Sequence, residues 1–209
     1  MIRGLYVVTD EGLSRGKSHA EIAAGAVLGG ASIIQLRDKT ASSLKLFSDA
    51  VKVAEICRGK ALFIVNDRID VALASGADGV HLGQDDIPAG IARKLCGNDF
   101  IVGVSVGSLA EAEKAVADGA DYIAVSPVYA TSSKADAGAG HGLSLVREIR
   151  QAFPALPLVG IGGLNKENAA EAVLAGLDSV AVISAVVGAE DIKSAAKELS
   201  YVISEAKHD

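Results

Sequence analysis

The stretch GGASIIQLR at residues 29–37 contains the pattern that decides the fold of this chain. Its glycines are followed by a small residue, a polar residue and a run of apolar residues. Such a glycine is typical of the left-handed position that ends a helix, and the apolar run is typical of a strand buried on both faces. The stretch therefore predicts that the chain leaves a helix and enters a buried strand.

The same pattern occurs three more times, in SGADGVHLG at 75–83, DGADYIAVS at 118–126 and AGLDSVAVIS at 175–184. The glycines of successive copies are 46, 43 and 57 residues apart. One strand with its helix and short connections needs roughly 20 to 30 residues. Each interval therefore has room for two strand–helix units.

The intervals contain further apolar runs that read as strands. They are LYVVTD at 5–10, ALFIVND at 61–67, DFIVGVSV at 99–106 and PLVGIGG at 157–163. Stretches with helical apolar spacing, such as 41–58 and 108–119, alternate with them. Eight strands, each followed by a helix, predict an α/β protein with one (βα)8 TIM-barrel domain over residues 1–209. An open doubly wound sheet is the alternative.

Composition narrows the class of protein. Half of the 209 residues are hydrophobic and only 4% are aromatic, so the core is expected to consist of Ala, Val, Ile and Leu. A formal charge of −6 argues against nucleic acid as a partner. Cys57 and Cys96 have no metal-binding spacing and are interpreted as reduced thiols. Without a signal peptide or a bilayer-spanning apolar run, we expect a cytoplasmic protein with no membrane partner.

The longest interval owes its length to VYATSSKADAGAGHG at 128–142, which has no apolar period. It directly follows the sixth expected strand, so it is interpreted as a long loop at 129–142 and not as a domain linker. Loops after barrel strands lie at the carboxyl-terminal face, where barrel active sites are built. We therefore expect an active-site loop.

The second strand ends in QLRDK, with Gln35, Arg37 and Lys39 at every other position. Alternate residues of an extended strand point to the same side. Arginine provides a two-pronged hydrogen-bond donor and lysine a mobile point charge, so together they suit a polyanion such as a diphosphate. The alternative is that these cations pair with carboxylates of neighbouring strands.

Acidic residues follow the third and fourth strands. Asp67 and Asp86 are expected at the same face of the barrel, where two carboxylates facing a phosphate suit Mg²⁺. Asp85 is a weaker candidate than Asp86. All three could also cap helices, which does not exclude metal binding.

A second anion site is predicted at the ends of strands seven and eight. Gly162 and Gly163, before a helix expected to begin near Asn165, would let backbone amides approach a phosphate, with Ser184 close by. Residues 131–134 lie between the two sites. His81 is interpreted mainly as a core residue, and the role of His141 is left open. This layout suggests two phosphorylated small-molecule substrates and a pyrophosphate product.

Together these motifs resemble the thiamine phosphate synthase family, also called thiamine-phosphate pyrophosphorylases, which is related to the thiazole tautomerases. QLRDK, VNDRIDVALASGADGVHLGQDD, GVS, ADYIAVSPVYATSSK, GIGG and VISA occur in the family's order and spacing. The resemblance implies a Mg²⁺-dependent transferase. It would join the pyrimidine of hydroxymethylpyrimidine diphosphate to a thiazole phosphate, or its carboxylated form, by a dissociative carbocation mechanism. The products would be thiamine phosphate and pyrophosphate.

The resemblance also implies roles for individual residues. Catalysis would fall to Arg37, Lys39, Ser105 and Lys134, and Mg²⁺ would bind to Asp67 and Asp86. The pyrimidine diphosphate would be held by Gln35, Arg37, Lys39, Asn66, Ser105 and Lys134. The thiazole phosphate would be held by Thr131, Ser132, Ser133, Gly163, Ile183 and Ser184.

Two positions depart from the family pattern. Ser133 stands where the family usually has threonine, which keeps the hydroxyl, and Gly107 stands where many relatives have histidine. Thiazole tautomerases use a histidine at about this place, so Gly107 weakens a tautomerase interpretation. That isomerase and a non-catalytic barrel binding thiamine precursors are the alternative functions. The oligomeric state is left open, with a homodimer as one option.

Overall fold

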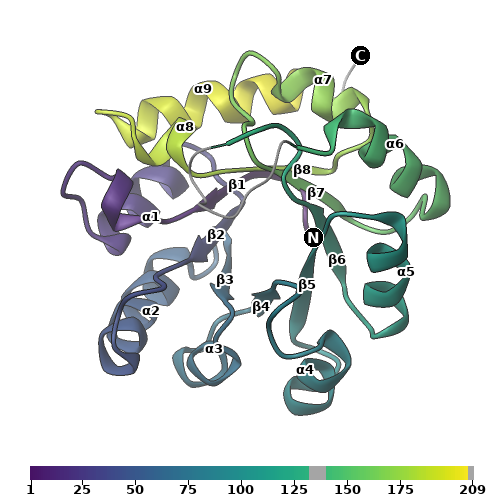
Figure 1. The fold of residues 1–209 in the computed structure, drawn as a ribbon. Helices are drawn as coiled ribbons and strands as arrows, with labels where there is room; N and C mark the ends of the chain where they lie inside the picture. The colour runs from purple at the N-terminus through teal and green to yellow at the C-terminus, as the bar shows by residue number, and fades with distance from the viewer. Residues whose placement is uncertain (132–139, 207–209) are drawn as a thin grey trace.

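Eight parallel strands close into a barrel in the computed structural model, which describes residues 1–131 and 140–206 (Figure 1). The strands follow one another around the barrel in sequence order, and β8 pairs with β1 in a register that runs from Gly4↔Ser179 to Val7↔Val182. This closure confirms the (βα)8 barrel and excludes the open sheet. The strands are β1 Gly4–Val8, β2 Ile33–Leu36, β3 Leu62–Asn66, β4 Gly79–Leu82, β5 Ile101–Val106, β6 Tyr122–Val125, β7 Leu158–Ile161 and β8 Ser179–Val182.

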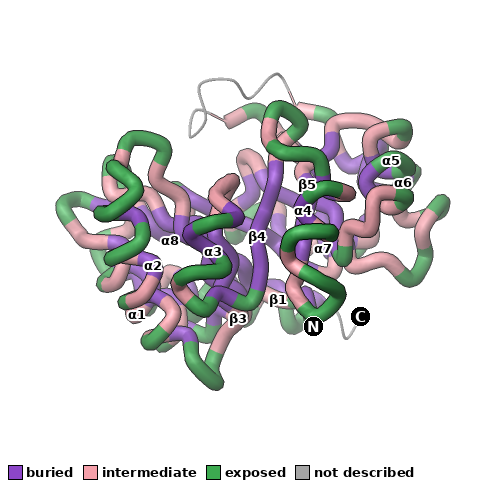
Figure 2. The backbone as a smooth tube through the Cα atoms, turned by 90° about the horizontal axis from the view of Figure 1, so that it is seen from below, coloured by how far each residue is buried: buried purple, intermediate pink, exposed green. Residues whose placement is uncertain are grey.

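Helices surround the strands, so that a strand such as β4 is buried along its whole length while outer helix surfaces are exposed (Figure 2). Among the described residues, no helix combines the length and apolarity needed to cross a membrane. The helices are η1 Glu11–Leu13, α1 His19–Leu28, α2 Ser43–Cys57, α3 Ile69–Ser75, α4 Ala89–Cys96, α5 Leu109–Ala117, α6 Gly142–Ala152, α7 Ala169–Leu174, α8 Ser184–Val187 and α9 Ile192–Glu205.

The connections around β7 and β8 differ from the sequence-based expectation. The helix expected near Asn165 begins only at Ala169. The Asn165 side chain accepts the Glu167 N–H at 2.8 Å, and the Asn168 side chain accepts the Asn165 N–H at 2.9 Å. Asparagine side chains that bond to nearby backbone in this way stabilise turns in competition with helix. After β8, the short helix α8 precedes α9.

The repeated pattern has the predicted local geometry. The glycines of the four copies all have positive φ, at Gly30, Gly76, Gly119 and Gly176. The polar position has a role that the sequence did not indicate. The carboxylates of Asp78, Asp121 and Asp178 accept the backbone N–H of Phe63, Val102 and Leu158, each at or beside the start of the preceding strand, at 2.7 to 2.9 Å.

Two arginines reinforce this edge of the barrel in the same manner. Arg93 of α4 pairs with Asp121, and its guanidinium donates to the carbonyls of residues 97, 100 and 119. Arg150 of α6 pairs with Asp178 and donates to the carbonyls of residues 153, 154, 156 and 176. These contacts lie at the amino-terminal ends of the strands, opposite the face where barrel enzymes have their sites.

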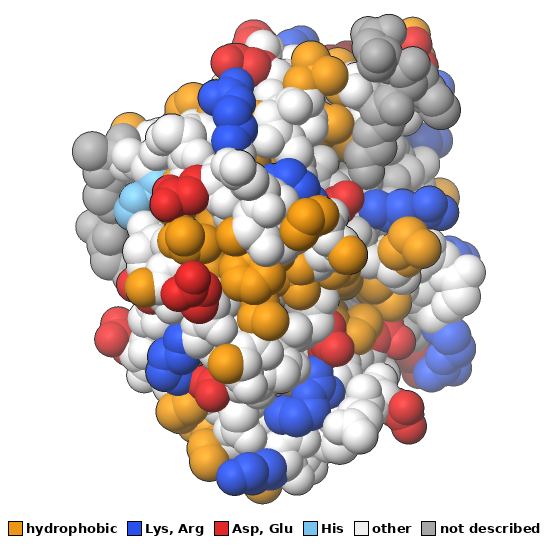
Figure 3. Space-filling view, turned by 90° about the vertical axis from the view of Figure 1, so that its right-hand side faces the viewer, with side chains coloured by type: hydrophobic (Ala, Val, Ile, Leu, Met, Phe, Trp, Pro, Cys, Tyr) orange, Lys and Arg blue, Asp and Glu red, His pale blue; other side chains and the backbone are white. Residues whose placement is uncertain are grey.

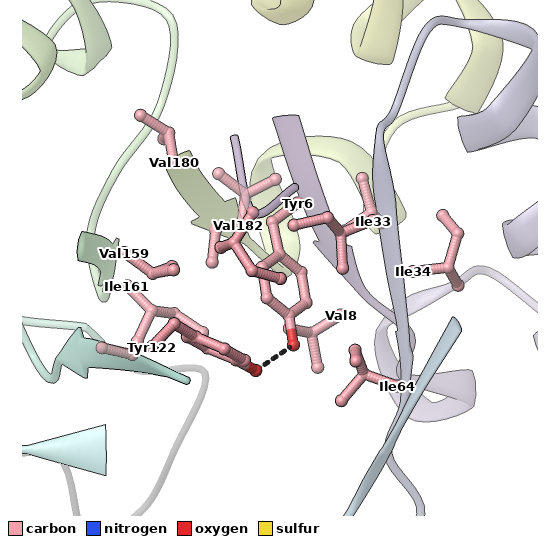
Figure 4. Close-up of a cluster of buried hydrophobic side chains, with 14 of the residues drawn as sticks. Tyr6, Val8, Ile33, Ile34, Ile64, Tyr122, Val159, Ile161, Val180 and Val182 are labelled. Atoms are coloured by element: carbon pink, nitrogen blue, oxygen red, sulfur yellow. Dashed lines mark hydrogen bonds between the residues drawn. The ribbon is translucent and has the colours of Figure 1, made fainter. Parts of the chain in front are cut away.

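Two tyrosines meet inside the barrel. Tyr6 of β1 and Tyr122 of β6 point toward one another and are joined through their hydroxyls at 3.0 Å (Figure 4). Both rings are fully buried. Gly103 of β5 makes the room, because a Cβ built there would lie 2.0 Å from the Tyr122 ring. The mainly apolar interior of the barrel therefore contains a pair of hydrogen-bonded tyrosines.

Candidate active site

Two adjoining cavities open at the carboxyl-terminal ends of the strands. The first, here called the charged pocket, has a volume of about 410 Å³ and is lined by residues near the carboxyl-terminal ends of β2 to β6 and in the segments after them, together with His141. The second, here called the glycine pocket, has a volume of about 390 Å³ and is lined by residues at the carboxyl-terminal ends of β7 and β8 and by residues that follow β6, β7 and β8. Ser126 and Pro127 line both. Residues of the two predicted anion sites therefore line two neighbouring cavities.

The polar side chains of QLRDK lie at two depths. Strand β2 ends at Leu36, so Arg37 and Lys39 belong to the following loop and not to an alternating strand face, which corrects that expectation. Both still line the charged pocket. Gln35 lies deeper, 5% exposed, with its amide donating to the Tyr6 hydroxyl at 2.6 Å.

Both cations also have acidic neighbours, as the alternative interpretation expected. The Arg37 guanidinium lies 3.4 Å from an Asp10 carboxylate oxygen, and the Lys39 ammonium lies 3.8 Å from an Asp67 oxygen. The Lys39 side chain is 58% exposed, so this pairing is loose enough to yield to an anion. Binding an anion and pairing with carboxylates are compatible in this pocket.

The two predicted metal-binding carboxylates lie together. The carboxyl groups of Asp67 and Asp86 are within hydrogen-bonding reach of each other. Burial first, and then the hydrogen bond to Asp86 and its charge, raise the pKa of Asp67 to about 6, although Lys39 and Arg37 act in the opposite direction. Asp85 also lines the pocket.

Neither carboxylate serves as a helix cap. The residues at the amino-terminal caps of α3 and α4 are Arg68 and Pro88, without capping side-chain hydrogen bonds. Asp67 has φ 61°, a left-handed conformation that non-glycine residues adopt rarely and that aspartate and asparagine tolerate best. Asp86 instead accepts the Gly83 N–H at 2.7 Å. The local backbone thus holds both groups at the pocket.

A hydrogen-bonded chain connects the charged pocket with the barrel core. His81 bonds to the Ser105 hydroxyl through Nε2 at 2.8 Å and to the Tyr122 hydroxyl through Nδ1 at 2.9 Å. Tyr122 continues to Tyr6, and Tyr6 to Gln35. Burial raises the pKa of both tyrosines, so their hydroxyls stay protonated. The sequence interpretation of His81 as a core residue is incomplete, since this 8% exposed side chain also lines the pocket.

The pocket wall at Gly107 is occupied by the histidine whose role the sequence left open. A Cβ built on Gly107 would lie 2.9 Å from His141 Nε2, so this imidazole takes the space that a side chain at 107 would need. Glu111, which the sequence did not indicate, accepts the Gly107 N–H at 2.7 Å and also lines the pocket. A pocket histidine is therefore present, supplied by a different element.

The glycine pocket brings together the described part of the second predicted site. Thr131, Gly163, Ile183 and Ser184 all line it. Ser132, Ser133 and Lys134 lie outside the described residues, as does most of the predicted loop 129–142. Gly162 and Gly163 have a packing role as well, because a Cβ there would lie 2.5 Å from Pro127 and 2.7 Å from Tyr129. The segment after β6 thus lies directly on the end of β7.

Two pockets thus adjoin at the mouth of a closed (βα)8 barrel. One is lined by cations and carboxylates, and the other by glycines and hydroxyl groups. This arrangement is typical of a barrel enzyme that acts on phosphorylated substrates. Comparison with known proteins specifies the family. Residues 5–186 match the family model described as thiamine monophosphate synthase. The chain belongs to this family.

Individual relatives agree along nearly the whole chain. The thiamine-phosphate synthase of Methanoculleus marisnigri is 54% identical over 97% of this chain and 96% of its own. That of Chloroflexus aurantiacus is 50% identical over 96% of this chain and 92% of its own. A solved structure of thiamine phosphate pyrophosphorylase from Pyrococcus furiosus has a TM-score of 0.89 at 41% identity, over 97% of this chain and 96% of its own.

Proposed function

We propose that this chain is a thiamine-phosphate synthase, a transferase whose two substrates occupy the two pockets. Hydroxymethylpyrimidine diphosphate would bind in the charged pocket, and a thiazole phosphate in the glycine pocket. The observation that carries the assignment of substrates is that the pockets adjoin, sharing Ser126 and Pro127. Two bound substrates could therefore meet at one reacting bond.

In the charged pocket, Arg37 and Lys39 would neutralise the diphosphate, with Asn66 and Ser105 completing the polar lining. Gln35, below them, would face the pyrimidine. Lys134, which lies outside the described residues, would add a further cation from the loop after β6.

The contact between Asp67 and Asp86 suits a divalent cation. Two half-buried carboxylates this close repel each other unless a cation or a proton lies between them. Burial first, and then the hydrogen bond to Asp86 and its charge, raise the pKa of Asp67. Oxygen ligands facing a phosphate are what Mg²⁺ prefers. We therefore propose these two residues as Mg²⁺ ligands, and bound Mg²⁺ would offset negative charge on the leaving diphosphate.

The reaction would begin with cleavage of the bond between the pyrimidine methylene carbon and the diphosphate oxygen. The bonding electrons leave with pyrophosphate, and the resulting carbocation is trapped by the lone pair of the thiazole nitrogen, which forms the new C–N bond. The charge that develops is on the leaving group, so Arg37 and Lys39, which line the charged pocket, would contribute most to catalysis.

The glycine pocket would bind the thiazole phosphate mainly through hydroxyls and backbone groups. Thr131 and Ser184 offer hydroxyl donors there, and Gly163 and Ile183 offer backbone. Ser132 and Ser133 would add hydroxyls from the loop.

Pyrophosphate release from both substrates in the presence of Mg²⁺ tests the proposal directly. Absence of turnover with the thiazole phosphate and with its carboxylated form would refute it. Lys134→Ala and Asp67→Ala are expected to lower turnover strongly without unfolding the protein, with Asp85→Ala as the control carboxylate in the same pocket. Wild-type rates for the first two variants would overturn the residue assignment.

A tautomerase activity is the alternative that one observation favours. Although Gly107 has no side chain, His141 places an imidazole beside it. An isomerase would exchange a proton of the thiazole phosphate in D₂O without the pyrimidine substrate, and the synthase would not. The non-catalytic alternative predicts tight calorimetric binding of both substrates without turnover.

We also infer a cytoplasmic location, because both cysteines are free thiols and the proposed substrates carry phosphate charges that keep them within a compartment. Whether the chain forms a homodimer can be tested by measuring its molar mass in solution by light scattering. Apolar side chains reach the surface among interspersed charges on the face shown in Figure 3. Ile91 and Leu95 of α4 are 46% and 61% exposed, so Leu95→Lys would dissociate a dimer formed through this helix.

A further inference from the structure

A second group of potential metal ligands includes the aspartate of QLRDK, and its residues line neither of the two pockets. Glu11 lies in η1, His19 is the first residue of α1, and Asp38 lies in the loop after β2, between Arg37 and Lys39. One ligand atom from each of the three lies within 4.8 Å of the others. Three segments that are separate in sequence thus converge on one point.

His19 gives this cluster its chemical character. The residue is 1% exposed, and its Nδ1 bonds to the Thr9 hydroxyl at 2.7 Å. Its Nε2 is the buried side-chain nitrogen that has no hydrogen-bond partner among the described residues. It lies 3.6 Å from Asp38 Oδ2 and 3.9 Å from Glu11 Oε1. Leaving a buried polar atom unsatisfied costs free energy, so a missing partner is expected here.

The two carboxylates are held so that each presents an oxygen to this nitrogen. Asp38 Oδ1 accepts the N–H groups of Thr40 and Ala41 and the Thr40 hydroxyl, at 2.8 to 2.9 Å. Asp38 Oδ2 is thereby directed to His19. Glu11 Oε2 lies 3.3 Å from the Lys45 ammonium, while its Oε1, which lies 3.9 Å from His19 Nε2, accepts the backbone N–H of His19 at 3.2 Å.

We propose that Glu11, His19 and Asp38 bind a divalent transition-metal ion such as Zn²⁺, at a site distinct from the Asp67–Asp86 pair. An imidazole nitrogen with two carboxylates suits such an ion better than it suits Mg²⁺, which takes oxygen ligands. Tetrahedral Zn²⁺ ligands at about 2.0–2.2 Å from the metal lie roughly 3.3–3.6 Å apart. The 3.6 Å distance from His19 Nε2 to Asp38 Oδ2 already lies at the edge of that range. The 3.9 Å distance from His19 Nε2 to Glu11 Oε1 would need to shorten by a few tenths of an ångström.

The surroundings of the cluster support a metal ligand at His19. A metal-binding histidine usually bonds through its other ring nitrogen to a polar group that fixes the ring, as Thr9 does here. The same hydroxyl accepts the Arg37 backbone N–H at 3.3 Å. A bound ion would therefore tie η1 and α1 to the loop that carries Arg37 and Lys39. The competing occupant is a proton on Nε2, which would make His19 a cation between the two carboxylates.

Co²⁺ titration of the chelator-treated full chain tests the site, with visible absorption and paramagnetically shifted imidazole NMR signals as readouts. Wild type and the Asp67→Asn/Asp86→Asn double variant are both expected to bind Co²⁺ with a histidine signal. Asp38→Asn keeps Oδ1 for Thr40 and Ala41 and replaces only Oδ2, and it should weaken binding at least tenfold. Zn²⁺ should compete for the same site.

Three results would overturn the proposal. One is no histidine-ligated Co²⁺ in wild type at millimolar concentration. Another is binding that the double variant loses and Asp38→Asn keeps. The third is a proton still on His19 Nε2 in ¹⁵N NMR with saturating Zn²⁺. This last measurement needs no variant, and if Asp38→Asn fails to fold, Glu11→Gln at the partly exposed ligand replaces it.

Discussion

Replacing Asp67 with asparagine is expected to stabilise the metal-free protein while abolishing its proposed activity. Burial, and after it the contact with Asp86, raise the pKa of Asp67 from 3.8 to about 6. That difference corresponds to about 3 kcal/mol of unfavourable free energy for the ionised group in the folded state above pH 6. Asparagine has no charge to repel Asp86, and it tolerates the left-handed backbone at this position well.

Because the Asp67 side chain is 25% exposed, solvent screens part of this penalty, and we expect a gain of about 1–3 kcal/mol. For a chain of this size, that corresponds to roughly 2–12 °C in Tm. A pKa that folding raises adds stability below the unfolded value and removes it as pH rises through the folded value. The advantage of Asp67→Asn should therefore be absent near pH 4, grow up to about pH 6 and stay constant above it.

Thermal unfolding followed by circular dichroism, in buffers with EDTA between pH 4 and 8, measures this difference. Asp85→Asn is the matched control, since Asp85 lines the same pocket and is not among the causes of the Asp67 pKa. Saturating Mg²⁺ should stabilise wild type and leave the variant unchanged, so that the difference shrinks or reverses. Equal Tm values for wild type and Asp67→Asn at pH 8 in EDTA would refute the reasoning.

Three further predictions concern the core, the edge of the barrel and the cation. Gly103→Ala should destabilise the protein by about 3 kcal/mol or more, because its Cβ would overlap the Tyr122 ring. Gly90→Ala in α4, where the new Cβ would make only ordinary contacts, should stabilise it by roughly 0.5–1 kcal/mol. The free energy of unfolding in urea should therefore fall for the first variant and rise for the second. Arg150→Lys should lower the free energy of unfolding by about 2–3 kcal/mol in the same assay, because lysine cannot reproduce the guanidinium hydrogen bonds to Asp178 and four carbonyls. A decrease of less than about 0.5 kcal/mol would contradict this role of Arg150. EDTA should abolish pyrophosphate release and added Mg²⁺ should restore it, and full activity in EDTA would exclude the proposed metal role.

The sequence was informative about the barrel because its pattern is local. Each copy of the repeat contains its own helix stop and its own buried run, so neighbouring residues were enough to count strands. The parallel arrangement then placed every strand end at one face. Arg37, Asp67 and Asp86 could be grouped in this way although they come from different strands, and the charged pocket does contain all three.

The hydrogen-bonded chain through the barrel escaped sequence analysis. Tyr6 and Tyr122 are 116 residues apart, and each reads as an ordinary apolar strand residue. The alternation of residues along β4 did carry one indication. His81 lies between Val80 and Leu82, whose side chains point out of the barrel toward the helices, so the His81 side chain points into the barrel. This alternation does not predict which side chain His81 meets across the barrel, because that depends on strand tilt and register.

The sequence by itself therefore determined the strand count, the barrel and the residues that reach its mouth, since helix stops and apolar runs are set by neighbouring residues. Only the tertiary structure decided that Asp67 contacts Asp86, that His141 occupies the space over Gly107, and that Glu11, His19 and Asp38 converge. These contacts depend on barrel closure and on how each loop folds back over the strand ends. Their geometry is fixed by packing between distant segments, which no local pattern encodes.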